Sequence, residues 1–207
     1  MKKLLFTMIA LIGLVVVFSG CKQQSKSEEM QEAFEKAYAE AEQAPQTETQ
    51  LFLGFQFGMN KKQLNSFLDS LVNAGKVYTD EQYAYKYDFK LSESLDLQIS
   101  FIPKFENDSL YAITYFLSSE YNLGKEMEMM MMSFNQSERR NSFRGYYVDD
   151  IIGETSYHYI KDNMMITFRR NGLSSYMDYE NVPIASRVKK EQKAKDDEVK
   201  KKSSEDF

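Results

Sequence analysis

The chain has 207 residues, with 31 acidic and 26 basic side chains and a formal net charge of −5 at pH 7. This balance argues against a nucleic-acid-binding protein, because phosphates attract a basic protein face. A single cysteine and a single histidine exclude an intrachain disulfide and any metal site built on several Cys or His ligands. With 15 Phe and 14 Tyr residues, the chain has enough aromatic side chains for a core that is stabilised by packing alone.

The first 20 residues have the parts of a secretory signal peptide. Two lysines precede an apolar stretch from Leu4 to Phe18, which is shorter than the ~20 residues that a membrane-spanning helix needs. The small residues Ser19 and Gly20 then lead to Cys21. We therefore expect residues 1–20 to be removed by cleavage just before Cys21.

The residues Phe18-Ser19-Gly20-Cys21 resemble the lipobox of bacterial lipoproteins, with Phe18 in place of the usual leucine. The resemblance implies that the Cys21 thiol is diacylglycerated, becomes the mature N-terminus and is held in a membrane by acyl chains. Lys22 follows instead of the aspartate of an inner-membrane retention signal, so we expect the outer membrane of a bacterial cell envelope. The alternatives, an ordinary cleaved signal or an uncleaved membrane helix, would leave the only thiol without a role.

Residues 21–50 continue with a polar segment rich in Gln and Glu. Its apolar residues recur at helical spacing and predict a short amphipathic helix: Met30, Phe34, Ala37, Tyr38 and Ala41. We interpret this helix as part of a spacer that lifts the domain off the membrane, with a partner-binding helix as the alternative.

We expect one α+β domain over residues 51–186. Its first part, about 51–120, starts with a helix whose apolar residues are three or four positions apart and which ends at Gly75. Alternating apolar runs then predict half-buried antiparallel strands at three places: residues 83–89, 95–101 and 111–117.

The second part, about 121–186, repeats this order with a methionine-rich helix and further short strands. One echo pairs LQISF (97–101) with MMITF (164–168) and makes Phe101 equivalent to Phe168, and another pairs residues 113–115 with 177–179. We therefore predict two helix-plus-antiparallel-meander units packed as one domain, with chance similarity between aromatic strands as the alternative.

This order of elements, with FGMNKKQL at residues 57–64, resembles the β-lactamase-inhibitor-like proteins and the small lipoprotein of outer-membrane barrel assembly. The shared motif is a helix start of the form Gly-x-x-x-x-x-Leu, here Gly58 and Leu64, while the Gly-x-Pro that follows in those proteins is missing. The resemblance implies binding rather than catalysis, and it assigns no functional residue.

The last segment, residues 187–207, has eight basic and six acidic side chains and almost no apolar ones. This composition predicts a solvated helix or a disordered tail. The acidic residues between the lysines weaken any attraction to anionic lipid.

His158 and a methionine-rich run are candidates for a catalytic and a metal-binding role, respectively. His158 is the only base available for a triad with Ser142, Ser156 or Ser174, but no Gly-x-Ser-x-Gly elbow presents a nucleophile, so we interpret it as a strand residue. The run MEMMMM at residues 127–132 offers thioethers to Cu(I). Helical spacing instead places Met127, Met130 and Met131 on a core face, with Met129 and Met132 outside it.

All six arginines lie between residues 139 and 187, and five are candidates for binding an anionic glycan or lipid headgroup: Arg139, Arg140, Arg144, Arg169 and Arg170. Ordinary surface charge explains them equally well. We conclude that the chain is a lipid-anchored, non-enzymatic envelope protein that binds an envelope protein or a glycan and needs no cofactor or metal. The alternative is a hydrolase of envelope polymers that uses acidic residues.

Overall fold

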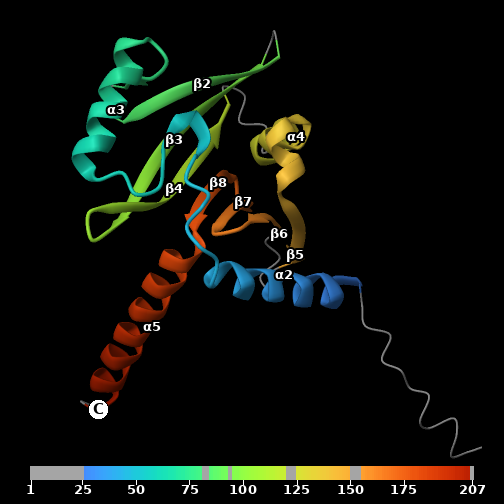
Figure 1. Cartoon of the computed structure of the whole chain (residues 1–207), viewed down its shortest axis with the longest axis vertical. Coiled ribbons are helices and arrows are strands. Elements are labelled where there is room, and N and C mark those ends of the chain that lie inside the picture. The colour runs from blue at the N-terminus through green and yellow to red at the C-terminus, as the bar shows by residue number, and fades with distance from the viewer. Residues whose placement is uncertain (1–25, 81–83, 93–94, 120–124, 150–154, 206–207) are drawn as a thin grey trace, which may run out of the picture.

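The computed structural model describes residues 26–80, 84–92, 95–119, 125–149 and 155–205. They form an α+β fold in which one eight-stranded antiparallel sheet has helices packed on both faces (Figure 1). The expected signal peptide and Cys21 lie outside the described residues.

The sheet brings the two parts of the domain together at its centre. The helical elements are α2 (Lys26–Glu42), η1 (Phe52–Gly54), α3 (Lys61–Asn73), α4 (Glu126–Gln136), η2 (Glu138–Ser142) and α5 (Val182–Glu205). The strands are β1 (Tyr78–Thr79), β2 (Tyr85–Ser92), β3 (Leu95–Glu106), β4 (Ser109–Ser118), β5 (Arg144–Asp149), β6 (Thr155–Lys161), β7 (Met164–Asn171) and β8 (Ser174–Asn181). Their order is β1-β2-β3-β4-β8-β7-β6-β5, so β4 and β8 are neighbours in the middle of the sheet.

Helix α3 begins and ends where local chemistry favours it. Asn60 and Gln63 form a capping box, in which the Asn60 side chain accepts from the Gln63 N–H at 2.8 Å and the Gln63 side chain accepts from the Asn60 N–H at 2.9 Å. Gly75, with φ of 66°, follows the last turn in a conformation that suits glycine. The helix predicted before Gly75 is therefore confirmed.

Helices α3 and α4 pack on the same face of the sheet and share one hydrophobic core with it. In α4, Met127 and Met130 are only 3% and 4% exposed, whereas Met132 is 58% exposed, so the predicted core face of this helix is confirmed. The buried strand residues of this core are Leu97, Ile99, Leu110, Ile113, Tyr115, Leu117, Tyr159, Met164, Ile166, Phe168, Met177 and Tyr179.

Strand register shows that the two sequence echoes cannot both describe one repeat. Phe101 lies opposite Tyr115, and the residue opposite Tyr179 is Ile166. If Tyr115 and Tyr179 correspond, as the second echo has it, Phe101 therefore corresponds to Ile166 and not to Phe168. The environments differ accordingly, since Phe168 is fully buried while Phe101 is only partly buried.

Helix α2 packs against the opposite face, beside β5 and β6. Ala37 and Ala41 are buried there against Ile160 and Met165, which point away from the main core because successive strand residues face opposite sides. We expected this helix to belong to a spacer ahead of the domain. It is instead packed on the domain, because its alanines allow the helix to approach the sheet closely.

Helix α5 follows β8 without a loop and extends away from the body of the protein (Figure 1). Val182 and Ala185 are buried in its first turn, whereas nearly all described residues from Arg187 onward are exposed. The charged segment predicted from residue 187 is thus the outer part of a helix that begins inside the domain. Near the domain this helix contacts α2 through an ion pair, in which Lys190 Nζ lies 3.2 Å from Glu42 Oε1.

Candidate functional site

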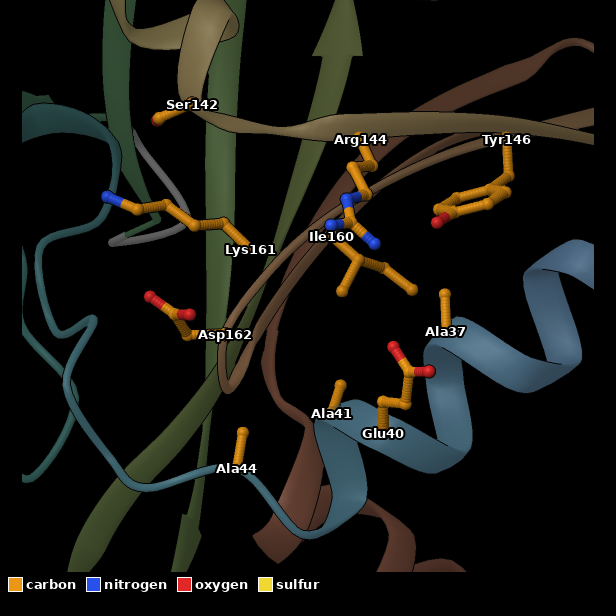
Figure 2. Close-up of a pocket in the computed structure, with 10 residues that line it drawn as sticks. All are labelled: Ala37, Glu40, Ala41, Ala44, Ser142, Arg144, Tyr146, Ile160, Lys161 and Asp162. Atoms are coloured by element: carbon orange, nitrogen blue, oxygen red, sulfur yellow. The ribbon is translucent and has the colours of Figure 1, made fainter.

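A pocket of about 340 Å³ lies between α2, β5 and the end of β6. Its residues come from three stretches that are far apart in the sequence (Figure 2): Ala37, Glu40, Ala41 and Ala44; Ser142, Arg144 and Tyr146; Ile160, Lys161 and Asp162. The alanines and Ile160 form small apolar walls, while the remaining residues are polar. This mixture, with a volume at the lower end of ~300–1,000 Å³, is typical of small-molecule sites.

Two charges point into this pocket from opposite walls. The Arg144 guanidinium extends from β5 and the Glu40 carboxylate from α2 (Figure 2). Within the part of the chain that the structure describes, neither side chain makes an ion pair or a hydrogen bond. Both groups are therefore available to a ligand.

The other charged residues of the pocket are already engaged. Lys161 forms an ion pair with Glu48. Asp162 lies in the turn between β6 and β7, and its Oδ2 accepts a long hydrogen bond of 3.5 Å from Thr47 Oγ1. Arg144 and Glu40 thus carry the uncommitted charge of the site, and the lining residues as a set are balanced in sign.

The five arginines singled out in the sequence do not gather at one place. Arg139 donates to the Gln50 carbonyl and lies over the ring of buried Tyr179. Arg140 donates to the Phe143 carbonyl at 2.6 Å and lies over the Tyr159 ring. These two guanidinium groups are committed to holding η2 against the core.

Arg169 and Arg170 are also paired. Arg169 Nε donates to Asp178 Oδ2 at 2.7 Å, and its guanidinium lies 4.3 Å from the centre of the Tyr176 ring. Arg170 Nη1 lies 3.6 Å from Glu128 Oε1. Of the five candidates, Arg144 is therefore the one that the fold places in a pocket with its guanidinium uncommitted.

His158 lies on the same sheet face as the pocket, beneath α2. Its ring stacks on Phe34 with centroids 4.4 Å apart, its Nε2 lies 2.8 Å from Ser156 Oγ, and its Nδ1 lies 2.9 Å from Thr167 Oγ1. Burial, together with nearby Lys189 and against the opposing effect of Asp178, lowers the pKa of His158 to about 4.

This geometry does not assemble a Ser-His-Asp triad, although it pairs His158 with Ser156. Thr167 occupies the Nδ1 side of the imidazole, where a triad needs a carboxylate. The Asp178 carboxylate instead accepts from Arg169 and, at 2.6 Å, from Thr114 Oγ1. Of the other two serines considered, Ser142 lines the pocket and Ser174 begins β8. The arrangement favours the interpretation of His158 as a strand residue.

No group of three or more His, Cys, Asp or Glu side chains in the described ranges is arranged to hold a metal ion. In α4, Met131 packs on the core, while Met129 is partly exposed.

The sequence pattern pointed to Arg144 but not to Glu40, Tyr146 or Asp162. These residues meet only because α2 packs on β5, a contact between segments about a hundred residues apart. The one local signal was the pair Ala37 and Ala41, whose spacing of four residues makes a small, flat helix face that favours close packing.

Comparison of the chain with protein-family models, with curated proteins and with solved structures finds no match. Among the helices that the structure describes, none is long and apolar enough to cross a membrane.

Proposed function

We propose that this chain is a lipid-anchored, non-catalytic binding protein of the bacterial cell envelope, held in the outer membrane through Cys21. The anchor is supported by the signal peptide and by the lipobox-like residues before Cys21. The binding role is supported by one observation above all, the pocket between α2 and β5 with uncommitted Arg144 and Glu40. Its ligand is a small molecule or an exposed part of an envelope protein or glycan.

We also propose that the domain consists of two equivalent helix-plus-meander units. Support comes from the antiparallel pairing of β4 with β8, which sets Thr114 opposite Asp178 and Tyr115 opposite Met177. Helices α3 and α4 also lie on the same face of the sheet. The resemblance to the β-lactamase-inhibitor-like proteins, which rests on the order of elements and on residues 57–64, implies binding.

The pocket is tested by filling it. Ala44→Leu adds a side chain at the pocket wall, whereas Ala33→Leu adds the same side chain on an exposed position of α2. We expect compounds from a panel of amino acids, short peptides, sugars and phosphate to bind the full-length protein in detergent. Ala44→Leu should abolish that binding and Ala33→Leu should leave it unchanged. If compounds of the panel bind Ala44→Leu as tightly as the wild type, the proposal is contradicted.

A second candidate function is hydrolysis of an envelope polymer, favoured by the two carboxylates, Glu40 and Asp162, that line the same pocket. Paired carboxyl groups are the usual machinery of glycoside hydrolysis. The decisive measurement is turnover of cell-wall glycan by the wild type and by Glu40→Gln. Turnover that disappears in Glu40→Gln, while the fold is retained, establishes the hydrolase and refutes the non-catalytic function.

A further inference from the structure

We propose that the pocket takes a compact zwitterion of the amino-acid or short-peptide class, with its carboxylate against Arg144 and its ammonium group against Glu40. This inference rests on the proposed function, because it assigns the ligand of that pocket. Arg144 and Glu40 point into one cavity from different elements and form no ion pair with each other. A ligand with opposite charges at its two ends satisfies both at once.

The charge balance selects against other ligand classes. A phosphate or other pure anion would gain the Arg144 guanidinium but would lie near the uncommitted Glu40 carboxylate, which repels it. A guanidinium also matches a carboxylate in two parallel hydrogen bonds, so Arg144 is well suited to the carboxyl end of a peptide. A neutral sugar would leave both charges desolvated without an ionic partner.

The walls select for a small side chain. Ala37, Ala41 and Ala44 present methyl groups along one side, and Ile160 closes the apolar floor. With about 340 Å³ in total, the space suits one to three residues with short aliphatic side chains. The hydroxyls of Ser142 and Tyr146 lie among the lining residues and supply partners for a peptide group.

The experiment uses three probes that differ only in their charged ends: L-alanyl-L-alanine, its N-acetyl derivative and its C-terminal amide. Affinities are measured by ligand-observed NMR titration of the full-length protein in detergent. We expect dialanine to bind, and each blocked derivative to bind about tenfold more weakly or worse, because one charge-assisted contact is lost. Inorganic phosphate and N-acetylglucosamine are titrated as probes of the competing classes.

Single variants assign each end of the ligand. Arg144→Gln should weaken dialanine about tenfold and leave the affinity for the amide unchanged, because the amide has no carboxylate to lose. Glu40→Gln should do the same for dialanine and spare the N-acetyl derivative. Matched controls are Arg187→Gln and Glu191→Gln, an exposed ion pair on α5 outside the pocket, which should change nothing.

The outcomes separate the ligand class from the proposed function. Blocked derivatives that bind as tightly as dialanine, or variants that weaken all three probes equally, overturn the zwitterion. Binding of phosphate or N-acetylglucosamine that Ala44→Leu abolishes, without any binding of dialanine, also overturns it but leaves the pocket as a binding site. If no probe responds to Ala44→Leu, both the ligand class and the proposed function fail.

Discussion

His158 is neutral in the folded protein because it is buried under Phe34 and hydrogen-bonded on both ring nitrogens. Its pKa is lowered from 6.5 to about 4 by burial, with a further contribution from Lys189. The unfolded chain therefore binds a proton at a higher pH than the folded chain does. Between these two pKa values, lowering the pH favours unfolding.

We predict that stability falls by about 2 kcal/mol between pH 7 and pH 5 because of this one residue. His158→Gln, which stays neutral, should remove most of that loss. The measurement is the free energy of unfolding in urea at both pH values for the wild type and the variant. Glu42 does not interfere, since Ser186 and Lys190 lower the pKa of its carboxyl below 4.5 and its contribution disappears only in more acidic solution. An equal loss in both proteins contradicts the prediction.

Asp178 is a second buried residue that can carry a charge. Its side chain is largely buried and accepts from Arg169 Nε at 2.7 Å and from Thr114 Oγ1 at 2.6 Å. Removing Arg169 would leave a buried carboxylate with one neutral partner. Because Arg169 itself is about one-third exposed, water replaces part of the lost interaction.

Arg169→Met should therefore destabilise the protein by about 1–3 kcal/mol, a range between the values for surface and buried ion pairs. Asp178→Asn in the same chain should restore part of that loss, which a double-mutant cycle in urea would measure. Arg170→Met is the control, since its contact with Glu128 is exposed on both sides and should be worth under about 1 kcal/mol. Additive single effects would show that Arg169 stabilises only by packing on Tyr176.

Among the elements, those with strong local patterns were predictable from the sequence. Helix α3 has its cap, its leucine spacing and Gly75 within one short segment, and the strand runs alternate over their own length. The position of α2 was not predictable in this way, because its buried residues are alanines and its partners Ile160 and Met165 lie far along the chain. The pocket depends on that contact, so Arg144 was the only one of its charged residues that the sequence analysis named as a binding candidate.

Substitutions in helix α4 test whether the methionines on its core face are structural. Met127 and Met130 are buried, so truncation to Ala should cost about 2–5 kcal/mol, whereas the volume-conserving change to Leu should cost under about 1.5 kcal/mol. Met132→Ala should change stability by less than about 0.5 kcal/mol, because its side chain is 58% exposed. Unfolding in urea measures all of these changes.

A Cu(I) site would give a different pattern. Leucine removes the sulfur, so tight one-to-one copper binding under reducing conditions would be lost in Met129→Leu or Met132→Leu, although neither change affects stability. Such a result would contradict the structural interpretation of these methionines and indicate a copper-binding protein.

At the scale of the whole molecule, the expected anchor and the pocket are joined by α2. The helix begins at Lys26, five residues after Cys21, and its last two turns supply Glu40 and Ala41 to the pocket. The domain is held on α2 by the sheet and by α5, through the contacts of Glu42 with Ser186 and Lys190. These contacts all lie within residues 26–205, so we expect the pocket to form whether or not Cys21 is lipidated.

Cys21→Ser should therefore release the protein from the membrane fraction without changing its pocket. In the wild type, mass spectrometry of the N-terminal peptide should show that the chain begins at Cys21 with added lipid, because two or more acyl chains are needed for stable anchoring. The variant should appear unlipidated, outside the membrane fraction, with the affinity of the wild type for dialanine. If the wild-type protein in the membrane fraction instead has an unmodified N-terminus that includes residues 1–20, the apolar segment itself is the anchor and the prediction is wrong.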